Sequence, residues 1–172
     1  FFTLFSLICS AKFHLSGKIR RNSSITLKVN IPSIYTLNKT NDLLITVNEE
    51  GRFSLDLPIN EQKFAHFFID NKSYILLLRP DKDLNLEIDE INHTILNFMG
   101  SAAPENQILY AIDINKIPFF MERENETYRY AKTNPNEVQD LVVLPWLKER
   151  NQRLSIIKKS TLTETDKNLL KS

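Results

Sequence analysis

The sequence predicts a mainly β protein with a helical C-terminal part: an antiparallel β-sandwich or partly closed barrel of about eight short strands, followed by three to four helices. Two observations lead to this class. Between residues 12 and 100, apolar residues alternate with polar ones in short runs separated by turn-forming residues. From residue 101 onward, apolar residues recur at helical spacing instead. We therefore expect an antiparallel β-domain over residues 12–100 and a helical connector over residues 101–172.

Length and composition are those of a globular chain with no strong charge. The 172 residues, of which 42% are hydrophobic, can form one sizeable core. Basic and acidic residues number 22 and 21, so the net charge of +1 creates no field that would attract nucleic acid or an anionic membrane. We expect no nucleic-acid partner, and membrane contact only through an N-terminal anchor, if one is present.

The first eleven residues resemble the end of a signal peptide, because the apolar run 1–8 is followed by Cys9, Ser10 and Ala11. This pattern predicts a protein exported to the periplasm or cell envelope, with residues 1–11 as a signal-peptide remnant cleaved after Ala11. Cys9 stands where a lipoprotein carries its lipid, but the large Ile8 before it departs from lipoprotein signals. The alternative is a buried, hydrophobic first strand.

The alternating pattern places the individual strands. Two runs, 64–69 and 74–78, are apolar on both sides and predict central strands or strands covered on both faces. Short turn segments at 48–51, 70–72 and 80–83 favour antiparallel meander pairing over βαβ crossovers. Runs with one polar face lie at 13–19, 25–31, 43–47, 53–57 and 84–88.

Helix signals occur at four places in the C-terminal part. Pro104 suits the first turn of a helix, and Asn134 followed by Pro135 is typical of an N-cap and a first helical position. Pro145 should kink or interrupt the helix that follows. Thr163 opens a last helical segment. The apolar residues of this part exceed what helices so short can bury among themselves, so we expect the connector to need another surface.

Metal sites receive little support from the sequence. His14, His66 and His93 are far apart and form no paired zinc-ligand pattern. The acidic and amide residues of segment 81–89 imitate the first positions of a calcium loop. Leu86 and Asn92 then replace the glycine and the glutamate that such a loop needs. A turn that leads into an exposed strand explains segment 81–89 equally well.

Catalytic sites receive no support either. The sequence contains no G-x-S-x-G elbow and no C-x-x-C pair, and its three glycines, at 17, 51 and 100, are too scattered for a phosphate-binding loop. We therefore predict no catalytic, cofactor-binding or metal-ligating residue in this chain, and no cofactor.

Three segments resemble, in order, the N-terminal domain that precedes the thioredoxin fold in exported TlpA-like thiol-disulfide oxidoreductases of Bacteroidetes-type bacteria. In that family, a strand reading F-x-G-x-I opens the domain, a P-G-D-x-L-x-V-like turn and strand comes late, and a G-x-x-A-x-x-N-like element leads into the helices. One departure is Lys82, which follows Pro80-Asp81 where the family usually shows P-G-D. The corresponding segments here are 13–19, 79–89 and 98–107.

This resemblance implies an antiparallel β-domain and a helical connector without a catalytic role of their own. The family's redox chemistry uses a W-C-x-x-C site in its thioredoxin domain, and no position here matches it, so no catalytic residue can be carried over. The implied function is a non-catalytic accessory domain that positions or docks a C-terminal thioredoxin-like domain in cis, with envelope proteins as substrates of the whole protein. A stand-alone envelope protein that binds a glycan or peptide is the main alternative, and an unrecognised hydrolase is a weaker one.

Overall fold

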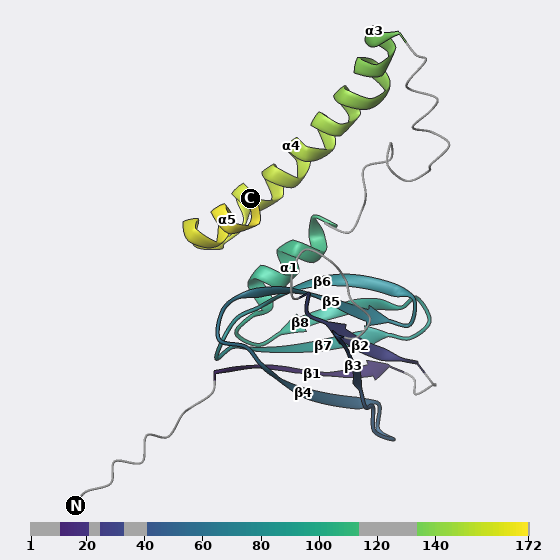
Figure 1. Ribbon diagram of the computed structural model, residues 1–172, viewed down its shortest axis with the longest axis vertical. Coiled ribbons are helices and arrows are strands. Elements are labelled where there is room, and N and C mark those ends of the chain that lie inside the picture. Colours follow the sequence, from purple (N-terminus) through teal and green to yellow (C-terminus); the bar gives the residue numbers. More distant parts are fainter. Residues whose placement is uncertain (1–10, 21–24, 33–40, 114–133, 172) are drawn as a thin grey trace, which may run out of the picture. The chain divides into compact units, whose positions relative to one another are not determined.

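The computed structural model describes residues 11–20, 25–32, 41–113 and 134–171. It confirms a mainly β protein with a helical C-terminal part (Figure 1). The signal-peptide segment with Cys9 lies almost wholly outside the described residues. The chain forms two compact units, Phe1–Gln107 and Ile108–Ser172, so the division falls within helix α1 (Ala103–Ala111).

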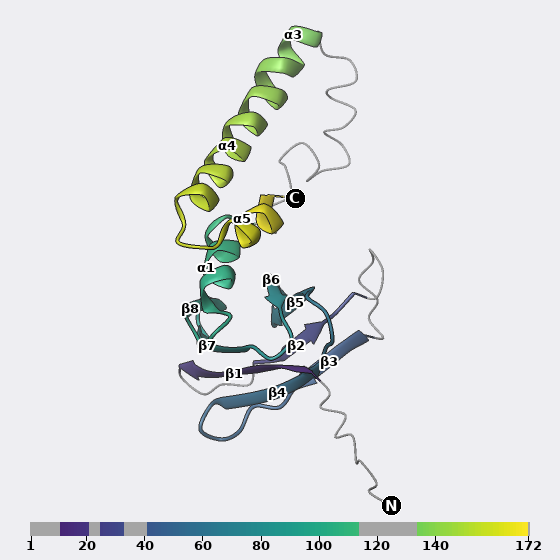
Figure 2. The same ribbon diagram turned by 90° about the vertical axis from the view of Figure 1, so that its left-hand side faces the viewer.

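In the described part of the chain, eight strands form two four-stranded sheets, which Figures 1 and 2 show from two directions. The sandwich prediction is confirmed, and within the described residues the strands do not close into a barrel. Sheet A has the order β4-β1-β7-β8, with β4 (Arg52–Pro58), β1 (Lys12–Arg20), β7 (Asp83–Asp89) and β8 (Thr94–Met99). Sheet B has the order β3-β2-β5-β6, with β3 (Asp42–Ile45), β2 (Leu27–Asn30), β5 (Lys63–Ile69) and β6 (Lys72–Leu78).

The strand order corrects the expectation of a simple antiparallel meander. Strands β1 and β7 pair in parallel, in a register that runs from His14 opposite Asp83 to Arg20 opposite Asp89. Strands β1 and β2 follow each other in sequence but lie in different sheets. The alternating pattern misled here because it identifies the buried face of each strand and says nothing about its neighbours.

The two runs predicted to be central or doubly covered have different environments. Strand β5 is an interior strand, between β2 and β6, but its outward face is open enough to leave Phe64 41% exposed. Strand β6 is an edge strand, yet its last residues, Leu76, Leu77 and Leu78, are all buried. Run 64–69 is therefore a central strand, and the end of run 74–78 is covered on both faces.

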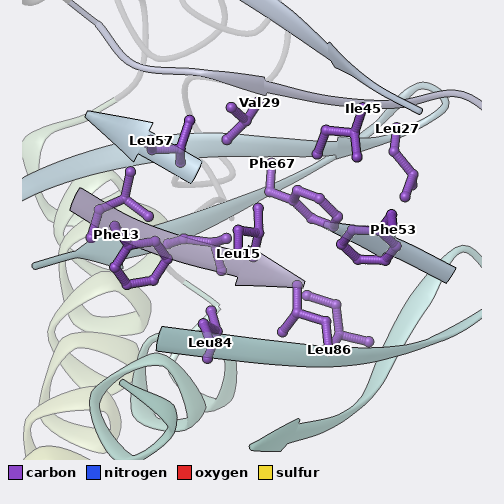
Figure 3. Close-up of a cluster of buried hydrophobic side chains, with 14 of the residues drawn as sticks. Phe13, Leu15, Leu27, Val29, Ile45, Phe53, Leu57, Phe67, Leu84 and Leu86 are labelled. Carbon is purple, nitrogen blue, oxygen red and sulfur yellow. The ribbon is translucent and has the colours of Figure 1, made fainter. Parts of the chain in front are cut away.

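The core lies between the two sheets, and Figure 3 shows side chains from both sheets meeting there. Phe53 of β4 stacks on Phe67 of β5, with ring centroids 6.3 Å apart, and so joins sheet A to sheet B. Gly17 of β1 is opposite Phe53 in the ladder. A Cβ at position 17 would lie 2.5 Å from Cζ of Phe53 and 2.3 Å from the carbonyl oxygen of Leu86. The absence of a side chain at Gly17 thus provides the space for the Phe53 ring.

The helices of the second unit begin where the sequence predicts. The side chain of Asn134 accepts a hydrogen bond from the N–H of Asn136, at 3.0 Å, and caps helix α3 (Pro135–Val138). The helix continues through a π-helical turn, η3 (Gln139–Val143), into α4 (Leu144–Lys159). Pro145 has no N–H to donate to the preceding turn, so a local change of helical pitch at this point is expected.

The last helix, α5 (Glu164–Lys171), starts at the predicted threonine. The hydroxyl of Thr163 accepts the N–H of Asp166, at 3.2 Å. Among the described helices, none is long and apolar enough to cross a membrane.

Replacing Gly17 by alanine should lower the free energy of unfolding by about 1–3 kcal/mol, because the new methyl group overlaps both a ring and a backbone oxygen. Urea titration of the chain, followed by circular dichroism, measures this change. Ser54→Ala, at an exposed position of β4, is the control and should change the value by less than about 0.5 kcal/mol. Adding Phe53→Leu to Gly17→Ala should restore only part of the loss, since the Leu86 oxygen stays. Equal stability of Gly17→Ala and wild type would contradict this packing.

Candidate functional site

The three segments that carry the family resemblance meet at one place in the first unit. We call this place the β7–α1 junction and define it as residues 79–83 and 100–106 together with the start of β1. The N–H of Asp81 donates to the carbonyl oxygen of Lys12 at 2.9 Å, and the N–H of His14 donates to that of Lys82 at 3.0 Å. The turn before β7 is thereby joined to the first strand of the chain.

Asp83 and Ser101 connect this turn to the segment that precedes α1. The Ser101 hydroxyl donates to Oδ1 of Asp83 at 2.6 Å and accepts the N–H of Asp83 at 3.0 Å. The N–H of Ala102 donates to the Asp83 carbonyl oxygen at 2.9 Å. The hydrogen bonds from Ser101 hold the pKa of the Asp83 carboxyl below its usual range. Gly100 has φ +99°, and a Cβ there would lie 2.4 Å from the same carboxylate.

Asn106 closes the edge of sheet B. Its Oδ1 accepts the N–H of Leu77 at 2.8 Å, and its Nδ2 donates to the carbonyl oxygen of Leu77 at 3.1 Å. The amide also donates to the carbonyl oxygen of Ala102 at 2.8 Å. The side chain is fully buried and thus pairs with β6 as another strand would. Asn106 therefore pairs with the sheet edge at Leu77 and anchors the first turns of α1.

Glu105 adds charge pairing to the same junction. Its carboxylate is almost completely buried and lies 2.8 Å from Nζ of Lys82 and 3.7 Å from Nη1 of Arg79. Glu105 is also in the first turn of α1, where the helix dipole favours a negative charge. Both basic residues belong to the turn before β7, so they attach the helix to that turn.

Asp81 gives the turn before β7 a left-handed residue. The N–H of Lys82 donates to the carbonyl oxygen of Arg79 at 3.3 Å, across Pro80 and Asp81. Asp81 has φ +60°, the left-handed conformation that glycine adopts most easily and aspartate tolerates better than most residues. The turn before β7 therefore adopts, at Asp81, a conformation that glycine would favour.

The outward face of sheet A is polar and linked by cross-strand pairs. Asp56 lies 2.6 Å from Nζ of Lys12 and 2.7 Å from Nδ1 of His14. Hydrogen bonding to Lys12, and then to His14, lowers the pKa of the Asp56 carboxyl. Asn85 donates to the hydroxyl of Ser16 at 2.9 Å. These groups are paired with one another and lie on the outer side of the sheet, so they form a solvated surface.

The histidines and carboxylates considered as metal ligands lie apart in the fold. His14 lies on sheet A, His66 on sheet B, and His93 in the turn between β7 and β8. The carboxylates of Asp83 and Asp89 bind different partners, Ser101 and Asn92 respectively. Across the described parts of the chain, no group of three or more potential metal ligands occurs.

His66 has an environment of its own on sheet B. Its ring stacks on Phe68, with centroids 6.1 Å apart, and its Nδ1 lies 3.1 Å from the hydroxyl of Ser73. Partial burial lowers the pKa of His66, because burial disfavours the charged ring. The residue therefore stabilises the sheet in its neutral form.

Comparison with known proteins does not assign a family. No family model matches the chain, and no curated protein matches it. The chain has a weak structural similarity to a candidate cell adhesion protein from Bacteroides ovatus ATCC 8483, with 11% sequence identity and a TM-score of 0.28. That similarity covers 53% of this chain and 43% of the other. At this TM-score it supports no conclusion about function.

Replacing Asn106 by alanine should lower the free energy of unfolding by about 2–4 kcal/mol, because the N–H and C=O of Leu77 lose their partner in a buried place. The exposed neighbour Gln107 supplies a matched control, and Gln107→Ala should leave the stability within about 0.5 kcal/mol of wild type. Denaturant titration of both variants measures the difference. Similar stability of the two variants would refute the edge-sealing role.

The lowered pKa of His66 predicts that the folded chain loses stability on mild acidification. Its folded-state pKa is lowered, so the unfolded chain binds the proton more readily and stability falls as the pH drops below the usual histidine value of about 6.5. His66→Phe keeps a ring against Phe68 and should reduce the fall in the urea midpoint between pH 7 and pH 5. His14→Phe, on the other sheet, is the control and should retain the part of the pH dependence that His66 causes. An unchanged pH dependence in His66→Phe would contradict the assignment.

Proposed function

We propose that this chain is the non-catalytic N-terminal accessory domain of an exported, thioredoxin-like thiol-disulfide oxidoreductase, and that it positions the redox domain. The observation that supports this proposal is the β7–α1 junction. The three segments that resemble the family are distant in sequence, yet their residues are hydrogen-bonded to one another. A shared structural role in the fold explains why these particular segments carry the resemblance.

The junction also suggests how an accessory domain would act. Asp83, Glu105 and Asn106 fix the first turns of α1 to both sheets of the sandwich, through Ser101, Lys82 and Leu77. A chain that leaves a domain through such an anchored helix starts in a defined direction, and this limits where the following segment can go.

The cysteine content of the chain is consistent with dithiol exchange that takes place in another domain. Dithiol exchange needs two thiols that alternate between a reduced pair and a disulfide. The 172 residues contain a single cysteine, Cys9. In the proposed arrangement, a C-x-x-C pair in the following thioredoxin-like domain performs the exchange, and the β-domain influences which envelope proteins reach it.

An insulin-reduction assay with two proteins tests this proposal. The 172-residue chain should be inactive, and the complete gene product should contain a C-x-x-C pair and reduce insulin. Within the complete protein, Asn106→Ala should slow reduction of a folded protein substrate more than Gln107→Ala does, while reduction of a small-molecule disulfide should remain equal. Insulin reduction by the 172-residue chain, or a complete gene product without C-x-x-C, would refute the proposal. The second result would instead favour a stand-alone envelope binding protein.

A further inference from the structure

A depression with a volume of about 720 Å³ lies at the end of the sandwich where the β5–β6 and β7–β8 turns meet. We call it the end depression. It belongs entirely to the first unit and shares no residue with the β7–α1 junction. Its lining residues are Thr26, Lys28, Asp42, Leu44, Asp70, Asn71 and His93.

A lysine–aspartate ion pair and a histidine–aspartate contact contribute to this depression. Nζ of Lys28 lies 2.8 Å from Oδ2 of Asp42, and Nε2 of His93 lies 3.3 Å from Oδ2 of Asp70. The remaining oxygen of Asp70 accepts the N–H of Thr26 at 2.8 Å. The four side chains come from β2, β3 and the two turns, so the depression requires both sheets.

Contacts between β6 and the β7–β8 turn hold the lining in place. Nζ of Lys72 donates to the carbonyl oxygen of Asn92 at 3.3 Å, and the hydroxyl of Tyr74 donates to that of His93. Asp70 and His93 have φ values of 51° and 48°, in the left-handed region that aspartate and histidine enter more often than most non-glycine residues. A site held in this way loses little entropy when a ligand binds.

Charge and polarity identify the class of ligand. Asp42 is already paired with Lys28, and its other oxygen accepts a hydrogen bond from the Asn30 amide, so a charged ligand would have to compete with these contacts. A hydroxyl group both donates and accepts hydrogen bonds. It can therefore bond to the carboxylates without breaking their existing contacts. Leu44 is 72% exposed and offers an apolar contact beside these polar groups. The depression is open to solvent, so a ligand there would lie on the surface and would not be enclosed.

We propose that the end depression binds a neutral carbohydrate, with Asp42 and Asp70 accepting hydrogen bonds from sugar hydroxyls, Lys28 donating to a hydroxyl oxygen, and Leu44 packing against a ring face. This inference does not depend on the proposed accessory function. A carbohydrate site on the β-domain would hold the protein near a glycan of the envelope.

Nuclear magnetic resonance titration of the ¹⁵N-labelled chain tests the site. Maltotetraose, cellotetraose and chitotetraose are added separately, up to about 20 mM, a concentration that detects dissociation constants of a few millimolar. At least one of them should cause saturable shifts at Thr26, Lys28, Leu44, Asn71 and His93. Inorganic phosphate and tetra-alanine serve as the charged and the peptide probe, and should cause smaller shifts at these residues.

Two variants and a matched control assign any binding to the end depression. Lys28→Met keeps the methylene stem over the Phe68 ring, which Nζ approaches to 4.5 Å, and removes the donor. This variant, and Leu44→Ser at an exposed position, should each weaken binding about tenfold. Lys12→Met, the same substitution on sheet A, should leave it unchanged. The proposal is wrong if no sugar causes shifts, if the shifts lie elsewhere, if both variants bind as wild type does, or if phosphate or peptide binds better.

Discussion

The parallel pairing of β1 with β7 is the contact on which the rest of the first unit depends. It places the first strand of the chain inside sheet A, with β4 on its other side. It also aligns His14 with Asp83, and the turn before β7 extends the same pairing through Asp81 and Lys82. Asp83 then binds Ser101, and α1 begins directly after that contact. A long-range pairing near the N-terminus thus determines where the helix starts.

Several contacts reduce the number of open N–H and C=O groups at the edges of the two sheets. Asn106 pairs with Leu77 at the edge of β6, and Val47 bridges to Phe53 beside β4. On β8, the side chain of Asn97 accepts the N–H of Phe98 at 2.9 Å. Edge strands with open N–H and C=O groups invite pairing with other chains, and these contacts reduce that risk. The asparagine that attaches α1 therefore also protects the sandwich.

The charged side chains of the first unit lie in three kinds of surroundings, and these surroundings indicate which side chains have a structural role and which could bind a ligand. Glu105 is buried and pairs with basic residues of one turn, so its loss would affect the junction directly. On the outward face of sheet A, the pairs of Asp56 are exposed and add little stability. The end depression differs from both, because its pairs line a concave region between elements of the two sheets. Its existence depends on the packing of the sandwich.

Several features of this protein follow from the sequence alone, because their causes are local. The period-two pattern of segment 13–19 predicts a strand, and Asn134-Pro135 and Thr163 predict two helix starts, since capping involves residues only a few positions apart. The change of period near residue 101 predicts the passage from strands to helices, and α1 begins close to it.

Tertiary structure decided the features that join distant segments. The parallel register of β1 and β7, the need for glycine opposite Phe53, and the pairing of Asn106 with Leu77 all link residues that are far apart in the chain. The end depression likewise needs residues from two sheets, and no spacing in the sequence indicates that Lys28 and His93 both line it. Periodicity reports which face of a strand is buried, whereas its neighbours are chosen by the packing of the whole core, and a single sequence does not encode that choice in any local pattern.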